Sequence, residues 1–235
     1  MFAIYKREIR SYFSSAVGYV FLAVIVALSA AAFSVTTLLS ATNDVSLYFT
    51  IMLFILMIAL PVLTMKLFSE ERKLKTEQLL LTAPVSIGGM VAAKFFAAFT
   101  VFAGANLLCS LSYITLFLYS DPEGGIILGN ILALTLVGAA FIAIGMFVSA
   151  LTENQLAAAI GTFGILLFLL CIGFLNSLIP WYPLRFVLSW FSIYSRYANF
   201  TNGFFDFSAL LYYASVCFIF LFLTARIYER RRYGA

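Results

Sequence analysis

Long apolar segments separated by short polar ones make up nearly the whole chain. Six of the apolar segments reach the length of about 20 residues that an α-helix needs to cross the hydrocarbon core of a membrane. We expect them to form membrane-spanning helices at residues 17–39, 45–65, 90–119, 126–151, 155–179 and 208–227. The pattern therefore predicts an all-α integral membrane protein with one transmembrane domain over residues 1–235.

The segment before the first predicted span, residues 1–15, has the pattern of an amphipathic helix. Its apolar side carries Phe2, Tyr5, Ile9, Tyr12 and Phe13, and its polar side carries Lys6, Arg7, Glu8 and Arg10. Such a helix is suited to the headgroup plane of a membrane. Residues 17–39 are too long for the apolar core of a signal peptide and lack a small-residue cleavage site, so we predict an uncleaved first span.

The longest polar interruption lies between the second and third predicted spans and reads FSEERKLKTEQLLLTAPVSIGGMVAAK from Phe68 to Lys94. It carries seven of the 24 charged residues, and its Leu79–Leu81 run is followed by Pro84. We predict that residues 68–89 form a cytoplasmic segment with a short amphipathic helix on which a partner docks. Lys66 and Lys94, at the ends of spans, are expected to extend to the membrane surface.

The stretch from 180 to 207 is unusually aromatic for a connection between spans. Its rings are Trp181, Tyr182, Phe186, Trp190, Phe191, Tyr194, Tyr197, Phe200, Phe204, Phe205 and Phe207. Two interpretations fit, a belt at the membrane interface or a pair of short helices that re-enter the membrane. Further upstream, the sequence SDPEGG at 120–125 predicts a turn. Glycines in the fourth and fifth spans, including Gly129, Gly138 and Gly145, fit either close helix packing or the general abundance of Gly in membrane helices.

Composition agrees with a membrane location. Hydrophobic residues make up 64% of the 235 residues and charged residues only 10%, against about 25% in a soluble domain. With six spans, one side of the membrane holds 12 of the 14 Lys and Arg residues, and the other side holds only Arg185 and Arg196. The positive-inside rule then places both termini and residues 68–89 in the cytoplasm. Because the net charge of +4 follows the membrane sides, it does not indicate nucleic-acid binding.

The chemistry that is missing from the sequence narrows the function. The span interiors contain no Asp, Glu, Lys or Arg, which argues against a transporter driven by proton or ion coupling. The sequence also lacks His, a P-loop and the motifs of zinc proteases and serine hydrolases. The three cysteines, Cys109, Cys171 and Cys217, lie within apolar runs, where cysteine acts as a small apolar residue. We therefore expect no catalytic, cofactor or metal site on this chain, and any energy must come from another protein.

Three parts of the chain resemble the ABC-2-type permeases, the membrane subunits of type-2 ATP-binding-cassette exporters. FSEERKLKTEQLLLTAPVS followed by VAAKFFAAF is similar to the segment after the second span of these permeases. The opening YKREIRSYFSSAVGYVFLAV and the late SRYANFTNGFFDFSALLYYASVCFIFLFLT also resemble the family, especially its gliding-motility and copper-site-maturation members. The resemblance covers essentially the whole chain, and its central part is the most specific.

The resemblance implies a six-span inner-membrane subunit that works as a homodimer above two cytoplasmic ATPase subunits, which would bind ATP and Mg²⁺. It implies a coupling helix at about Thr76–Thr82, a connecting or elbow helix at 1–15 that carries Lys6, Arg7 and Arg10, and short re-entrant extracytoplasmic helices in 180–207. The predicted coupling residues are Glu70, Glu71, Arg72, Lys75, Thr76, Glu77, Leu79, Leu80, Leu81 and Thr82. Many relatives have S-G-T-x-E where this chain has Leu74–Gln78, and loss of the glycine predicts a more continuous helix here.

Other functions stay open at this stage. A membrane scaffold that recruits a soluble partner without transport would have a similar docking segment, and an intramembrane enzyme is a weaker alternative because no acid–base or metal set is visible. Asn106, Asn130 and Asn176 fit either a substrate path or hydrogen bonds between helices. The sequence does not identify the substrate, and mechanical work on an extracytoplasmic accessory protein is an alternative to export.

Overall fold

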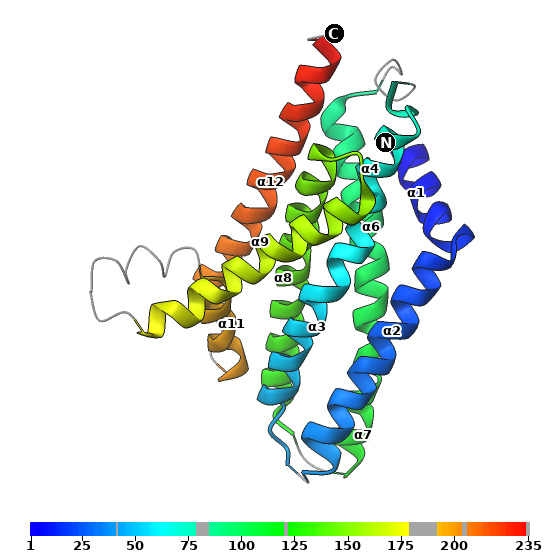
Figure 1. The fold of residues 1–235 in the computed structure, drawn as a ribbon. Coiled ribbons are helices and arrows are strands. Elements are labelled where there is room, and N and C mark those ends of the chain that lie inside the picture. The colour runs from blue at the N-terminus through cyan, green and yellow to red at the C-terminus, as the bar shows by residue number, and fades with distance from the viewer. Residues whose placement is uncertain (41, 79–84, 120–121, 179–191, 204–205, 234–235) are drawn as a thin grey trace.

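The computed structural model describes residues 1–40, 42–78, 85–119, 122–178, 192–203 and 206–233; side chains are described for these residues except 174–178 and 233. Every regular element in these ranges is a helix (Figure 1). Six helices of the described residues are long and apolar enough to cross a membrane. The predicted all-helical multi-pass membrane protein is therefore confirmed at this level.

The first half of the bundle follows the predicted order. Helix α1 covers Phe2–Ser14, and α2, Ala16–Phe33, continues as the π-helical turn η1, Ser34–Leu38. The second span is α3, Ser46–Thr64, followed after Met65 by α4, Lys66–Lys73. The third is α6, Ile87–Ser110, followed after Leu111 by α7, Ser112–Tyr119.

The second half consists of α8, Gly124–Leu151; α9, Gln155–Leu178; the short α11, Ile193–Thr201; and α12, Phe207–Tyr233. The N-terminus of α1, the C-terminal end of α12 and helix α4 all lie at the same end of the bundle, which we call the terminal end (Figure 1). An even number of crossings requires this arrangement.

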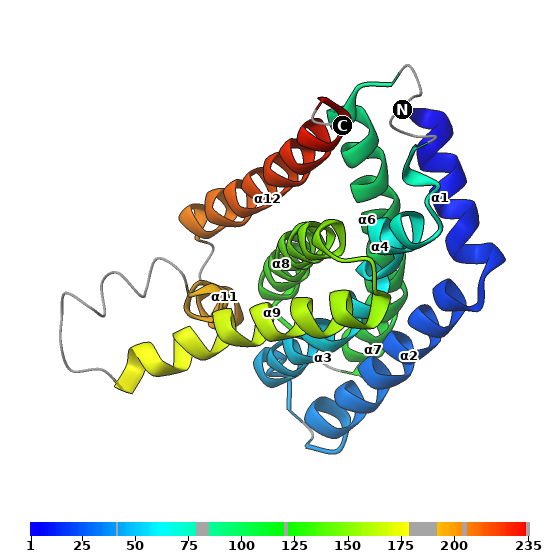
Figure 2. The ribbon, with the colours of Figure 1, turned by 45° about the horizontal axis from the view of Figure 1, so that its top comes forward.

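Helix α8 is the centre of the molecule. It contacts α3, α4, α6, α9, α11 and α12, and Figure 2 shows it enclosed by its neighbours. Its sequence allows this position because small residues face the other helices. A Cβ atom added to Gly145 would lie 2.2 Å from Thr64 Oγ1 of α3, and one added to Gly138 would lie 2.2 Å from the Phe102 ring of α6. Close packing at these two glycines is confirmed, whereas Gly129 faces open space.

Several predicted boundaries are wrong because hydropathy marks the edge of the lipid and not the end of a helix. The second span continues through the charged residues to Lys73, inside the predicted loop 68–89. The last helix continues through the basic residues 230–232 to Tyr233. Gly124 and Gly125, predicted in a turn, begin α8.

The aromatic segment 180–207 is described only in part. Residues 180–191 lie outside the described residues, and α11 forms the later half. This helix buries Ile193, Tyr197 and Phe200 against the bundle, and Tyr197 donates a hydrogen bond of 2.9 Å to the Phe49 carbonyl oxygen of α3. At least this part of the segment packs on protein and is not an aqueous loop.

Candidate functional site

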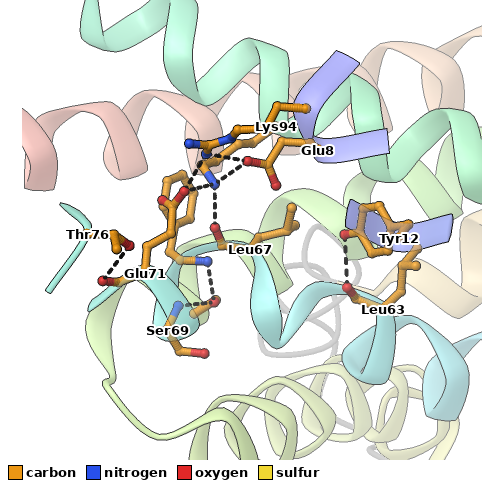
Figure 3. Close-up of polar contacts among 11 residues, drawn as sticks. Glu8, Tyr12, Leu63, Leu67, Ser69, Glu71, Thr76 and Lys94 are labelled. Atoms are coloured by element: carbon orange, nitrogen blue, oxygen red, sulfur yellow. Dashed lines mark hydrogen bonds and ion pairs between the residues drawn. The ribbon is translucent and has the colours of Figure 1, made fainter. Parts of the chain in front are cut away.

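A buried lysine organises the terminal end of the bundle. Lys94 of α6 is 0% exposed, and its Nζ lies 3.1 Å from Glu8 Oε1 of α1 and 3.0 Å from Glu71 Oε1 of α4 (Figure 3). The same ammonium donates a hydrogen bond of 2.8 Å to the Leu67 carbonyl oxygen. The prediction that Lys94 extends to the membrane surface is therefore wrong, because two carboxylates and a carbonyl replace its water inside the protein.

Arg7 completes the cluster from α1. Its guanidinium donates to Glu8 Oε1 at 2.7 Å and to Glu71 Oε1 at 2.6 Å. Burial works against the charge, but the hydrogen bonds and charges of Glu8 and Glu71 outweigh it and raise the pKa of Arg7. The four residues form a neutral set of two cations and two carboxylates, which we call the Lys94 cluster. It joins α1, α4 and α6.

The cluster continues through aromatic contacts to the last helix. Lys94 Nζ lies 5.1 Å from the centre of the Phe68 ring, and this ring lies 4.8 Å from the ring of Tyr228 on α12. On the other side, the Tyr12 hydroxyl of α1 donates a hydrogen bond of 3.1 Å to the Leu63 carbonyl oxygen of α3 (Figure 3). Burial, with a smaller effect from Glu8, raises the pKa of Tyr12.

Two arginines bind the last carbonyl groups of α8, which have no partner within the helix. Arg72 of α4 donates to Leu151 O at 2.8 Å and pairs with Glu153 at 3.0 Å. Arg231 of α12 donates to Ala150 O at 2.7 Å and pairs with Glu77 at 3.3 Å. The segment after α3 is thereby attached to α8 and α12 as well as to α1 and α6.

Ser149 of α8 causes the interruption between α3 and α4. Its hydroxyl accepts hydrogen bonds of 3.1 Å from the backbone N–H groups of Phe68 and Ser69, and it donates one of 3.0 Å to the Met65 carbonyl oxygen. A side chain inserted into the helical hydrogen-bond ladder in this way breaks the helix. The break lies one turn after Pro61, which has no N–H to contribute.

Beyond α4 the chain turns at Leu74–Thr76, and these three residues are exposed. Lys75 has φ +58°, in the left-handed region that favours glycine. The more continuous helix predicted here is therefore wrong, because the chain turns at Lys75. Thr76 supports the turn by donating a hydrogen bond of 3.3 Å to the Glu71 carbonyl oxygen.

The predicted coupling residues divide into two groups. Glu71, Arg72 and Glu77 form ion pairs within the chain, and Glu70 is half-buried. The predicted residues Lys75 and Thr76 are exposed, as are their neighbours Lys73 and Leu74, which are not among the predicted coupling residues; Leu74 is 63% exposed. Glu77 and Gln78 are helical, and the predicted residues Leu79, Leu80, Leu81 and Thr82 lie outside the described residues.

The three residues predicted for the connecting helix also divide between contacts within the chain and exposed positions. Helix α1 forms as expected, and its inner side packs against α2 and α6. Arg7 belongs to the Lys94 cluster, whereas Lys6 and Arg10 are exposed. The prediction that Glu8 lies on the polar side of this helix is wrong, because Glu8 is buried and pairs with Lys94. Its position four residues before Tyr12 and three after Tyr5 placed the carboxylate on the inner side of the helix.

Of the three asparagines predicted for a path or for packing, the two whose side chains are described, Asn106 and Asn130, have different partners. Asn106 donates a hydrogen bond of 2.9 Å from α6 to Thr135 Oγ1 of α8, which is the packing role. Asn130 is fully buried and donates to the Ile126 carbonyl oxygen of its own helix at 2.9 Å. The side chain of Asn176 lies outside the described residues. Among the described residues, no group of three His, Cys, Asp or Glu could hold a metal ion.

No protein-family model matches the chain, and no curated protein matches it.

Proposed function

We propose that this chain is the permease subunit of an ABC-2-type exporter, which couples ATP hydrolysis by a partner ATPase to export or to extracytoplasmic mechanical work. The exposed turn from Lys73 to Thr76, which we call the α4 turn, is the proposed docking point for the ATPase. The proposed assembly has two permease copies and two ATPase copies in the inner membrane, with both termini and the α4 turn in the cytoplasm. ATP and Mg²⁺ bind to the ATPase and not to this chain.

One observation carries the proposal: the residues on both sides of the α4 turn are attached to four other helices. Glu71 pairs with Arg7 of α1 and Lys94 of α6, Arg72 binds the end of α8, and Glu77 pairs with Arg231 of α12. A displacement of the turn by a partner would therefore be passed to several spans at once. Rigid attachment of this kind is what a permease without its own energy source needs.

Because some of the predicted coupling residues form ion pairs within the chain, we expect other residues to contact the ATPase. Glu71, Arg72 and Glu77 are committed to contacts within the chain, so they transmit displacement in this proposal. Leu74 is an apolar side chain that is 63% exposed at the tip of the turn, between two exposed lysines. An exposed leucine with a charged rim is a suitable anchor for a protein partner.

The exposed anchor gives a sharper test than the buried carboxylates, because Glu71→Ala would disrupt the Lys94 cluster whether or not an ATPase docks. The experiment reconstitutes the chain in vesicles with an ATPase encoded beside it and measures the increase in ATP hydrolysis that the permease causes. Leu74→Asp should remove most of this increase. Leu39→Asp makes the same change at another exposed leucine and should preserve the increase. Leu39 is 80% exposed and directly follows η1, at the end of α2 that lies opposite the terminal end (Figure 1).

Equal stimulation by wild type and Leu74→Asp would exclude the α4 turn as the docking point. A stable complex with the ATPase that shows neither an increase in ATP hydrolysis nor transport in a sealed-vesicle assay would favour the scaffold function instead.

A further inference from the structure

Two pockets follow one another along the outer side of the molecule. The first, of about 530 Å³, lies between α1 and α4, next to the Lys94 cluster; we call it the polar pocket because most residues that line it are charged or polar. The second, of about 470 Å³, is a groove between α2 and α3 that only apolar residues line, including Val17, Val20, Val24, Leu28, Ile55 and Ile58. The polar pocket ends at Ser15 and Lys66. The apolar groove begins at Ala16, the next residue of the chain, and at Val62, one turn before Lys66.

The groove has the length of one lipid tail. Its residues on α2 run from Ala16 to Leu28, which corresponds to about 18 Å along a helix axis. One leaflet of the hydrocarbon core is about 15 Å thick. The groove also lies on two predicted spans, so lipid chains surround it, and its polar neighbour lies at the terminal end, where a headgroup belongs.

The charges of the polar pocket indicate which headgroup fits. Six charged residues line it, and four of them, Arg7, Glu8, Glu71 and Lys94, neutralise one another in the Lys94 cluster. The other two are Lys66 and Glu70, and neither forms an ion pair with any residue that the structure describes. They lie four positions apart on one face of α4, with the lysine first, which is the less favourable order for pairing with each other.

We propose that the two pockets together bind one phospholipid with a zwitterionic ethanolamine headgroup. Its phosphate pairs with Lys66, its ammonium pairs with Glu70, and one acyl chain occupies the groove between α2 and α3. A primary ammonium donates hydrogen bonds to a carboxylate, which a choline headgroup cannot do. An anionic glycerol headgroup would leave Glu70 next to a negative charge. This proposal does not depend on docking of an ATPase.

Native mass spectrometry of the full chain in detergent tests the headgroup. Phosphatidylethanolamine, phosphatidylcholine and phosphatidylglycerol with identical acyl chains are the probes. We expect phosphatidylethanolamine to bind about tenfold more tightly than the other two, as the loss of one charged hydrogen bond would predict. Glu70→Gln should remove this preference, and Lys66→Gln should weaken binding of all three lipids. Lys73→Gln, on the same helix but outside both pockets, should bind like wild type.

A second variant tests the groove separately. Val24→Trp should fill the groove and weaken phosphatidylethanolamine binding about tenfold or more, whereas Ile160→Trp, at an exposed position of α9, should not. Melting temperatures measured without added lipid establish that each variant is folded. Equal or tighter binding of phosphatidylglycerol by wild type, or unchanged binding by folded Glu70→Gln and Val24→Trp, would overturn the proposal.

Discussion

The ammonium of Lys94 lies 3.1 Å from the carboxylate of Glu8, although 86 positions separate the two residues in the chain. The contact joins the N-terminal helix to the third span inside the protein. Because Glu71 of α4 shares the same ammonium, the segment that leads to the α4 turn cannot move independently of α1 and α6.

Removal of one member of the Lys94 cluster should destabilise the protein strongly, because it leaves a buried charge without its partner. We expect Lys94→Met to lower the free energy of unfolding by about 3–5 kcal/mol. The double variant Glu8→Gln with Lys94→Met should be less destabilised than the sum of the single variants. Reversible unfolding in mixed micelles measures both, with Lys6→Met on the exposed side of α1 as the control. If Lys94→Met and Lys6→Met unfold alike, Lys94 is not held in a buried ion cluster.

Lys75 is the position where a glycine should improve stability. A residue with a Cβ in the left-handed region costs about 1 kcal/mol relative to glycine, so Lys75→Gly should raise the free energy of unfolding by about that amount. Lys75→Val should lower it, because a β-branched side chain tolerates this conformation least. Reversible unfolding in mixed micelles measures both changes. A loss of stability in Lys75→Gly would show that the backbone at Lys75 is not left-handed.

Two glycines of α8 should respond in opposite directions to the same substitution. Gly145→Ala places a Cβ against Thr64 and should lower the free energy of unfolding by about 1–3 kcal/mol. Gly129→Ala meets no atom within 4 Å and should be neutral or stabilising by up to about 1 kcal/mol, since alanine favours the helix. Melting temperatures of the two variants give the comparison, and equal values would contradict the close contact between α3 and α8.

The hydroxyl of Tyr12 should make the free energy of unfolding depend on pH. Burial raises the pKa of Tyr12 in the folded state. The contribution of Tyr12 to the free energy of unfolding is therefore complete below the unfolded pKa of about 10, and it is lost as the pH rises above that value. At pH 7, Tyr12→Phe should lower the free energy of unfolding by about 1 kcal/mol, because it removes the hydrogen bond to the Leu63 carbonyl oxygen. The difference between wild type and Tyr12→Phe should shrink in unfolding measurements above pH 10. A difference that is constant from pH 7 to 11 would mean that Tyr12 is not buried.

The span count and order could be predicted from hydropathy because each span needs about 20 apolar residues, and few other folds satisfy that pattern. The position of Lys94 could not be predicted in the same way. A lysine four residues inside the predicted end of a span has the same sequence pattern whether it extends to water or pairs inside the protein. The difference depends on Glu8 and Glu71, which lie far away in the chain.

The α4 turn shows a second limit of the sequence. Lysine has a higher helix propensity than glycine, so Lys75 indicates a helix at this position. Tertiary contacts oppose that local preference here. Arg72 is bound to the end of α8 and Glu77 to Arg231 of α12, and the chain between them has to turn. Such contacts join residues that are 79 and 154 positions apart, which no local pattern contains.

Site-specific crosslinking tests the central claim, docking of an ATPase on the α4 turn, most directly. A photo-crosslinking amino acid is placed at Lys75 and, as the matched control, at Leu39, which directly follows η1. Membranes that contain the coexpressed ATPase are irradiated, and the products are identified by mass spectrometry. We expect a crosslink to the ATPase from position 75 and none from position 39. Absence of a crosslink at 75, or equal crosslinking from both positions, would exclude docking of the ATPase on the α4 turn.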